Sequence, residues 1–170
     1  MKNNALENFI TSIKGSWTGL NSETVIKGRK LLEQLAKTPI SESWLADLHH
    51  KKQESVELYR DQDQGFILLA HVERQGNYRV PHNHGAGWVF YAVQHGTMEM
   101  STYSQVTDKT GKSFLVSRGA NDLNTGECNV YLPDDIHDTK CLSDYVLMFR
   151  LTSCDFKSEK REGRLVQYTN

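Results

Sequence analysis

The sequence has few cysteines, no excess of either charge and no long apolar run. Its 3 cysteines, Cys128, Cys141 and Cys154, are widely spaced and form no C-x-x-C pair. This spacing argues against a disulfide framework and against a zinc site built from thiolates. We therefore expect free thiols.

Neither the charge nor the hydropathy pattern favours a nucleic acid or a membrane as partner. Lysine and arginine number 20 against 21 aspartates and glutamates, and no basic cluster stands out. A nucleic-acid or anionic-membrane partner would need one. No apolar run approaches the roughly 18 residues of a membrane span, and the first 17 residues are too polar for a signal peptide. We expect a cytoplasmic protein that binds small molecules.

The first fifty residues have the periodicity of helices. We predict one helix over Asn4–Trp17, a second capped by Ser22 that runs to about Lys37, and a short third helix capped by Ser41. Pro39 ends the second helix, because proline disfavours helical geometry at the residue before it. Three short helices bury little surface on their own, so we expect them to flank another unit.

From Ser55 onward the chain has short segments rich in β-branched and aromatic residues, separated by turn-forming stretches that include 118–125. Nine such segments in about 115 residues indicate a barrel or sandwich. We predict a single mainly β domain over residues 1–170, with a helical flank at 1–52 and a β-barrel at 53–170. The predicted strands are Val56–Tyr59, Phe66–Val72, Tyr78–Val80, Trp88–Val93, Met98–Tyr103, Ser113–Val116, Cys128–Leu132, Tyr145–Leu151 and Arg164–Tyr168.

Three histidines have the spacing of a metal site. His82 and His84 lie two apart in an extended segment, and on a strand such residues point to one face, about 6–7 Å apart. His137 follows another β-like run and the turn signal at Pro133–Asp135. Imidazole binds Fe, Ni, Cu and Zn well. The pattern predicts a three-histidine metal site inside a barrel.

These stretches resemble the two sequence motifs of the cupin superfamily. The run GNYRVPHNHGAGWVFYAVQHG, residues 76–96, is similar to the first motif, and GECNVYLPDDIH, residues 126–137, is similar to the second. The resemblance implies a double-stranded β-helix, also called a jelly-roll barrel. It also implies a metal ion held by His82, His84 and His137.

The first cupin motif commonly provides a glutamate as a fourth ligand, and that position is Val89 here. Three histidines without a carboxylate, after a helical N-terminal region, are similar to the cysteine dioxygenase branch, the thiol dioxygenases. The resemblance implies Fe(II), with Ni, Zn, Cu or Mn as alternatives, and oxidation of a small thiol by O2 to a sulfinic acid. Three neutral imidazoles leave the ion's charge uncompensated, which favours an anionic substrate. By analogy with cupins, a homodimer is also expected.

Two features of that branch are missing. The cysteine of its cysteine–tyrosine cross-link corresponds to Val89, and its Ser-x-His-x-Tyr relay corresponds to LMFRLT at residues 147–152. Two alternatives therefore stay open. One is a non-catalytic cupin that binds a metal or small ligand as a sensor or store. The other is a cupin enzyme of another class, such as an isomerase or a non-thiol dioxygenase.

Three further residues are candidates for the site. The family binds the substrate carboxylate through an arginine on an early strand, and Arg60 matches it best, unless it is an ordinary surface arginine. Arg150 stands where the relay histidine would be, and a cation there must reach solvent, pair with a carboxylate or bind an anionic substrate. Tyr91 has the inward parity of Val89, so its hydroxyl either bonds substrate or oxygen or is satisfied locally.

The other histidines are expected to lie outside the metal site. His49 and His50 stand in a polar stretch and are predicted to be solvated. His95 precedes a turn and is predicted to be exposed. His71 ends a predicted strand; a structural or exposed role is expected for it, and the alternative is that it lines the mouth of a cavity.

Overall fold

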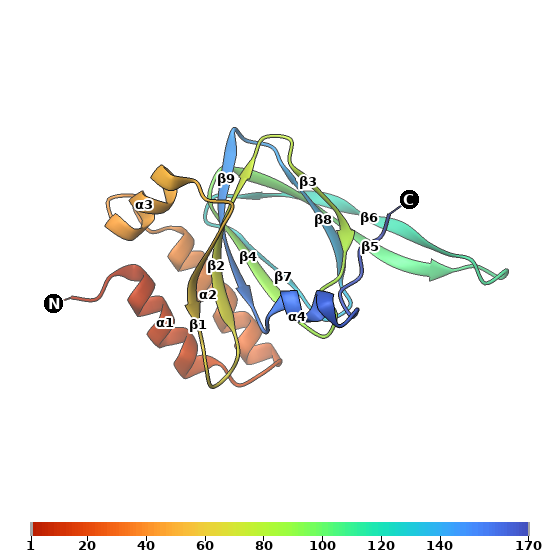
Figure 1. The fold of residues 1–170 in the computed structure, drawn as a ribbon, viewed down its shortest axis with the longest axis horizontal. Coiled ribbons are helices and arrows are strands. Elements are labelled where there is room, and N and C mark those ends of the chain that lie inside the picture. Colours follow the sequence, from red (N-terminus) through yellow and green to blue (C-terminus); the bar gives the residue numbers. More distant parts are fainter. Residues whose placement is uncertain (1, 170) are drawn as a thin grey trace.

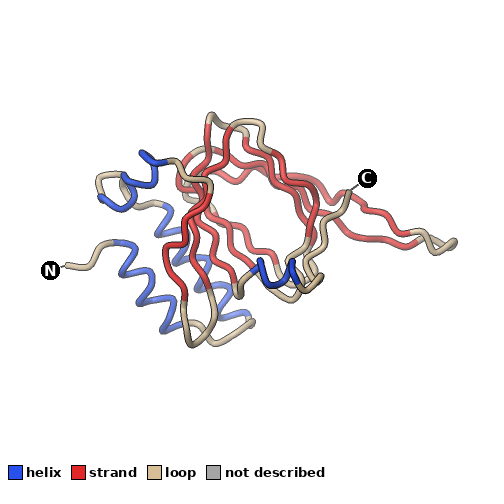
Figure 2. Tube along the Cα trace, viewed as in Figure 1, coloured by secondary structure: helices blue, strands red, loops and turns tan. Residues whose placement is uncertain are grey.

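The computed structural model describes residues 2–169, which form two antiparallel sheets and four helices (Figures 1 and 2). One sheet has the order β1-β2-β9-β4-β7 and the other the order β3-β8-β5-β6. Together they enclose a barrel, and the predicted mainly β double-stranded β-helix is confirmed. The elements are α1 (Ala5–Ser16), α2 (Ser22–Ala36), α3 (Ser43–Lys51), β1 (Ser55–Arg60), β2 (Ile67–Arg74), β3 (Tyr78–His82), β4 (Val89–His95), β5 (Thr97–Thr107), β6 (Ser113–Asn124), β7 (Cys128–Tyr131), β8 (Ile136–Cys141), β9 (Tyr145–Thr152) and α4 (Phe156–Arg161).

The three N-terminal helices form where the sequence predicts them, but two caps differ. Asn21, not Ser22, caps α2, because its side chain accepts a hydrogen bond from the backbone N–H of Thr24 at 2.9 Å. The residue before α3 is Glu42 rather than Ser41, and it makes no capping hydrogen bond. In the part of the chain that the structure describes, no helix is long and apolar enough to cross a membrane.

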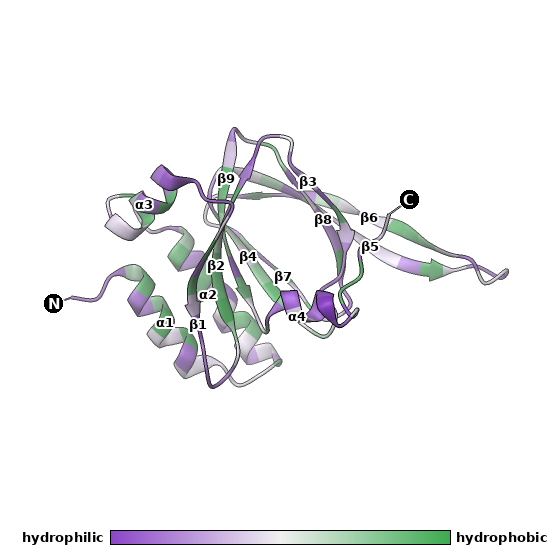
Figure 3. Ribbon diagram, in the orientation of Figure 1, coloured by the Kyte–Doolittle hydropathy of each residue, from purple (hydrophilic) through white to green (hydrophobic). Residues whose placement is uncertain are grey.

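Helices α1 and α2 cover the outer face of the five-stranded sheet (Figure 1). Trp17, at the end of α1, stacks on Trp88 with ring centroids 4.8 Å apart, and Phe90 is fully buried beneath α2. Figure 3 shows the hydrophobic colour on β2 and β4, whereas hydrophobic and hydrophilic stretches alternate along α1 and α2. Burial of this apolar surface attaches the helices to the sheet.

Side chains of the five-stranded sheet alternate between two cores. Trp88 and Phe90 belong to the cluster under the helices, whereas Val89 and Tyr91 belong to a second cluster inside the barrel. The parity predicted for this strand is therefore confirmed. A cavity lies beside the inner cluster, and Phe156 and Leu165 belong to both.

The C-terminal part of the chain differs from the prediction. The segment Arg164–Tyr168 is not a strand; it contributes only an isolated bridge between Gln167 and His82. Helix α4 was not predicted, because its six residues are nearly all polar and carry no apolar period. Strand β8 was not predicted either, because its sequence IHDTKC is mostly polar.

Residues 118–125, predicted as a connector, lie almost entirely within β6, which pairs with β5 up to Asn124. The two strands form a long hairpin whose tip extends away from the barrel (Figure 2). Most of β6 is exposed, so it needs no alternation of apolar residues, and the strand signal was absent for that reason.

Gly28 of α2 lies against Phe90, and a Cβ at that position would come 2.9 Å from the ring. We expect Gly28→Val to lower the free energy of unfolding by about 1–3 kcal/mol through overpacking. Urea unfolding followed by circular dichroism measures the effect. The control is Gly15→Ala in α1, which has open space and should be neutral or stabilising. A neutral Gly28→Val would contradict the packing described here, and separate helix and barrel transitions would contradict the predicted single domain.

Candidate metal centre

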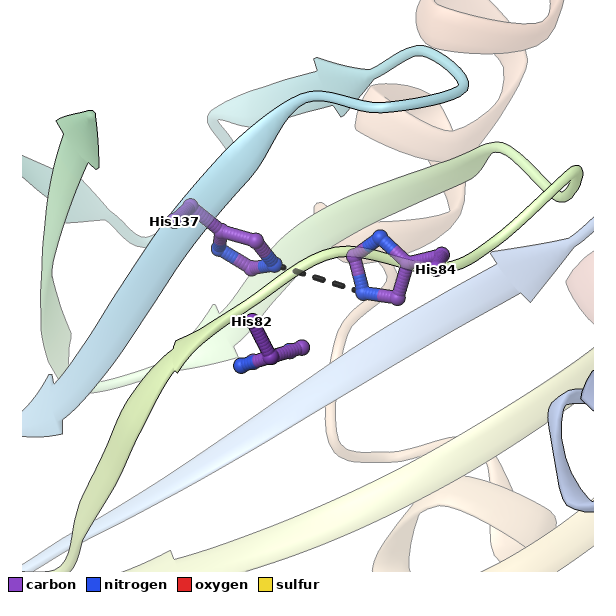
Figure 4. A group of neighbouring side chains, drawn as sticks. All are labelled: His82, His84 and His137. Atoms are coloured by element: carbon purple, nitrogen blue, oxygen red, sulfur yellow. Dashed lines mark hydrogen bonds between the residues drawn. The ribbon is translucent and has the colours of Figure 1, made fainter. Parts of the chain in front are cut away.

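The structure brings the three predicted histidine ligands together (Figure 4). His82 is the last residue of β3 and pairs across the sheet with His137 of β8, while His84 lies two residues further on in the loop to β4. Their ligand atoms all lie within 4.8 Å of one another. His84 has left the strand, so its approach to His82 depends on the loop and not on strand geometry alone.

The spacing of the ring nitrogens fits a single ion. The Nε2 atoms of His84 and His137 are 3.3 Å apart. Imidazole nitrogens bind metals such as zinc at about 2.0–2.1 Å, so two of them on one ion at about 90–109° lie about 2.8–3.4 Å apart. His84 and His137 therefore have the spacing of two ligands on one ion, and the ligand atom of His82 lies within 4.8 Å of theirs.

All three imidazoles are held in the neutral form that binds metals. Burial is the main cause that lowers their pKa values, and the neighbouring histidines or Arg150 add to it. The pKa of His84 falls to about 2 and that of His137 lies well below its usual value. His82 donates from Nδ1 to the carbonyl oxygen of Val80 at 2.8 Å, which leaves its Nε2 lone pair for an ion.

Two aromatic rings fix the imidazoles in place. Phe156 of α4 stacks on His84 with centroids 4.8 Å apart, and Tyr131 stacks on His137 at 3.9 Å. The loop after His84 is tightly packed under α4, because a Cβ on Gly87 would overlap the ring of Phe156. A glycine is therefore required at position 87 for Phe156 to stack on His84.

The segment after β9 holds the same loop through polar contacts. The side-chain oxygen of Asn83 accepts from the backbone N–H of Val166 at 2.8 Å. Glu159 of α4 accepts from the N–H of Ala86 at 3.2 Å and is itself held by two hydrogen bonds from Arg164. These positioning residues were not predicted, since no local motif links the loop to residues some eighty positions later.

A cavity of about 760 Å³ opens beside His82 and His84, and a smaller pocket of about 200 Å³ adjoins it. These sizes suit a small molecule. The wall of the larger cavity carries more basic than acidic side chains. The basic residues that line it are Arg60, Arg79, Arg150, Lys157 and Lys160, and the acidic residues are Glu57 and Asp155.

Arg60 lies at the rim of the cavity, as the last residue of the edge strand β1. Its guanidinium bonds Glu57 at 2.8 Å and Asp155 at 3.3 Å, and its side chain is 39% exposed. Both partners are carboxylates, so the charge of Arg60 is already compensated. The structure places it in the cavity wall but gives it the surroundings of a surface arginine.

Arg150 points into the cavity from β9, the central strand of the sheet. Its guanidinium carbon lies 5.6 Å from the centroid of the Phe156 ring. Among the described residues, no carboxylate lies within ion-pair distance of it, and its Nε is buried without a hydrogen-bond partner. Pairing with a carboxylate, one of the three options for this residue, is thus not observed.

Tyr91 is buried beside the three histidines. Its hydroxyl lies 3.2 Å from Nε2 of His84, and its ring centroid lies 5.3 Å from that of His137. Burial raises the pKa of Tyr91 despite the opposing charge of Arg150, so the hydroxyl keeps its proton at neutral pH. The structure thus places the Tyr91 hydroxyl beside Nε2 of His84, a nitrogen that can bind a metal ion.

Of the remaining histidines, His49 differs from prediction, whereas His71 lies in the cavity wall, one of the positions allowed for it. His49 is buried and bridges α3 to the barrel, with hydrogen bonds to Tyr145 at 2.9 Å and Gln94 at 2.6 Å. The polar sequence around His49 does not predict this burial, because the partners of His49 are nearly fifty and one hundred residues away. His71 is also buried, 8% exposed, and lines both pockets. His50 is exposed, as predicted.

Comparisons with known proteins reveal similar folds but no family. No protein-family model matches the sequence, and no curated protein is similar to it. Solved structures of similar fold include KdgF from Halomonas sp. (15% identity, 58% of this chain and 74% of that one, TM-score 0.45). The cupin domain of Cnp3 from Schizosaccharomyces pombe is 10% identical over 66% of this chain and 69% of that one, with a TM-score of 0.47.

Oxalate decarboxylase from Bacillus subtilis is 14% identical over 61% of this chain and 24% of that one, with a TM-score of 0.44. Likenesses at this level concern the fold alone. The functional argument therefore depends on the site, and the likeness to cysteine dioxygenases stays a prediction.

We expect the protein, purified with added Fe(II), to hold about one ion per chain. Each of the variants His82→Ala, His84→Ala and His137→Ala should lower this iron content at least tenfold. The reason is that losing even an outer-shell partner of a ligand costs about 10–100-fold in affinity. Elemental analysis measures the content. His50→Ala is the matched control, since His50 is exposed on α3. Full metal content in all three variants would contradict the site.

The metal-free protein should become less stable as the pH falls from 7.5 to 5. Unfolded histidines titrate near pH 6.5, whereas the buried ones keep lower pKa values, so the unfolded state binds more protons below pH 6.5. Each such histidine lowers the free energy of unfolding by about 1–2 kcal/mol over this range. Urea titrations at several pH values measure how the free energy of unfolding changes with pH. His84→Gln should reduce this slope by the equivalent of about one bound proton. An unchanged slope in that variant would contradict a neutral, buried His84.

Proposed function

We propose that this protein is a metal-dependent dioxygenase that oxidises a small thiol to a sulfinic acid, with Fe(II) held by His82, His84 and His137. The observation that carries the proposal is the cluster of three neutral imidazoles, His84 and His137 buried and His82 half-buried, at the edge of a cavity rich in basic groups. The overall reaction, R–SH + O2 giving R–SO2H, balances without another reductant.

Fe(II), when bound, stabilises a substrate thiolate and leaves positions open for substrate and O2. The ligand set also suits Ni, Zn or Cu, and Mn is a further alternative. His82, His84 and His137 bring no negative charge, and none of the carboxylates among the described residues joins their cluster. The site therefore retains positive charge and attracts an anionic substrate.

The chain's own residues would position the substrate and exclude water. Phe156 and Tyr131 stack on two of the imidazoles and shield them from solvent. Tyr91 keeps a protonated hydroxyl beside His84, where it can donate a hydrogen bond to a reacting group. It is the candidate for the part that the relay plays in cysteine dioxygenases. Holding the reactants together contributes to the rate enhancement.

A second candidate is a non-catalytic protein that binds a metal and a small anion. It is favoured by β9, whose residues on the parity that faces the cavity are Val146, Met148, Arg150 and Thr152. None of these has the acid–base chemistry of a histidine or tyrosine. A cupin enzyme of another class, such as an isomerase or a non-thiol dioxygenase, is the third candidate.

The proposal is tested by loading the protein with Fe(II) without oxygen and then recording oxygen uptake over a panel of small thiols. We expect thiol-dependent uptake with formation of the matching sulfinic acid. Uptake should fall at least about 100-fold in His82→Ala, since three ligands hold the ion. Tyr91→Phe should lower kcat by about 10–100-fold, in the range of a lost proton donor.

Uptake no greater than that of His82→Ala for every thiol would exclude the thiol dioxygenase. Thermal stabilisation by a small anion without turnover would then favour the non-catalytic protein. Turnover with a metal other than iron, and without thiol, would favour another class of cupin enzyme.

A further inference from the structure

The Tyr91 hydroxyl lies among the atoms of the candidate metal centre. Its oxygen is 3.2 Å from Nε2 of His84, and Nε2 of His137 is 3.3 Å from the same nitrogen. Oxygen and nitrogen ligands bind a metal such as zinc at about 2.0–2.2 Å, so two of them on one ion at about 90–109° lie about 2.8–3.5 Å apart. The Tyr91 oxygen therefore has the spacing from His84 that a further ligand on the same ion has.

Strand β4 directs Tyr91 to this position. Val89 and Tyr91 both belong to the inner cluster of the barrel. Val89 stands where the cupin motif commonly has a glutamate, and it has no atom that binds a metal. Tyr91 is two residues further along the same face of the strand, and its longer side chain brings an oxygen to His84. The strand thus supplies an oxygen to the cluster although the carboxylate is missing.

Binding of an ion by His84 would take away the acceptor of this hydroxyl. Nε2 of His84 faces Nε2 of His137 and is the nitrogen that points into the cluster. Among residues 2–169, the same nitrogen is the one hydrogen-bond acceptor of the Tyr91 hydroxyl. Tyr91 is buried, and a buried hydroxyl without an acceptor is unfavourable. Binding of its oxygen to the ion removes this penalty.

Arg150 supplies a positive charge beside the same oxygen. Tyr91 and Arg150 stand directly opposite each other on β4 and β9, where the Cβ atoms of such pairs are about 4.5–5.5 Å apart. In the described part of the chain, no carboxylate lies within ion-pair distance of Arg150. A bound cation favours the deprotonated form of an acid that coordinates it. A Tyr91 phenolate would then lie between two positive charges, the ion and the guanidinium.

We infer that Tyr91 is a fourth protein ligand of the metal centre and binds the ion through its phenolate oxygen, together with His82, His84 and His137. Tyrosine is a known iron ligand in proteins. The guanidinium of Arg150 balances the charge of the phenolate, so the centre keeps the positive charge of the ion. In this role Arg150 is a positioning residue for Tyr91.

The protonated hydroxyl described above belongs to the metal-free protein. A substrate thiol that takes the place of Tyr91 on the ion would pass its proton to the phenolate. One negative charge leaves the ion as another arrives, and Tyr91 again has the neutral hydroxyl that can donate to a reacting group. This exchange rests on the proposed function, whereas the ligand role of Tyr91 does not.

Spectra of the protein loaded with equimolar Fe(III), without thiol, test the ligand role. A phenolate bound to Fe(III) gives an intense visible charge-transfer band that imidazole ligands do not give. Resonance Raman spectra excited in this band contain the ring vibrations of the bound tyrosine. We expect both signals from the wild-type protein, and ring-deuterated tyrosine should shift the vibrations.

Matched variants identify the tyrosine that binds. Tyr91→Phe should lower the band at least about tenfold, because only imidazoles then remain on the ion. Tyr131→Phe is the control: Tyr131 also lies beside a candidate ligand, His137, but its hydroxyl bonds Sδ of Met100 at 3.3 Å. This variant keeps the stacked ring and should keep the band. A full band in Tyr91→Phe, or its loss in Tyr131→Phe alone, would overturn the inference.

The wild-type protein decides if Tyr91→Phe does not fold or binds no iron. Iron bound according to elemental analysis, without the visible band, would overturn the ligand role. The band without thiol-dependent oxygen uptake by the Fe(II)-loaded protein would exclude the proposed reaction and retain the ligand role. Thiol-dependent uptake by a protein whose Fe(III) form lacks the band would retain the reaction and exclude the ligand role.

Discussion

The three central strands of the five-stranded sheet, β2, β9 and β4, are buried on both faces, and the rest of the structure depends on this constraint. The outer face of this sheet packs against α1 and α2 through residues such as Trp88 and Phe90, and this apolar contact provides much of the stabilisation. The inner face is therefore free to carry polar groups. Tyr91 and Arg150 stand opposite each other on β4 and β9, and His71 lies on β2 beyond Arg150. A polar cavity can exist in so small a protein because a separate core supports its wall.

The second sheet and the C-terminal segment complete the site. Pairing of β3 with β8 brings His82 to His137. His84 lies in a loop that α4 clamps, with Phe156 on its ring and Glu159 on the backbone of Ala86. Rigid neighbours of this kind prepare a site before any ligand arrives, so little ordering is needed on binding. The polar helix α4 is thus part of the site, although its sequence gives no sign of it.

Local patterns were sufficient for part of the fold. The helices were predictable because apolar residues recur at helical spacing, and most strands because β-branched and aromatic residues alternate between turns. Strand β8 was missed because its polar residues are satisfied by partners distant in sequence: Asp138 accepts from Tyr78 and Tyr103. The tail at Arg164–Tyr168 was mistaken for a strand because its composition suits one, yet it forms only a single bridge.

For the site, the sequence by itself determined the three histidines, since their types and spacing carry the chemistry. It also determined that Tyr91 points inward, since side chains alternate along a strand. Only the tertiary structure decided which cation is free to bind. The sequence favoured Arg60 and offered substrate binding as only one of three options for Arg150, but ion pairs depend on neighbours from distant segments, such as Asp155 beside Arg60. The same holds for His71, whose unpaired nitrogen results from the packing of β2 against β9 inside the barrel.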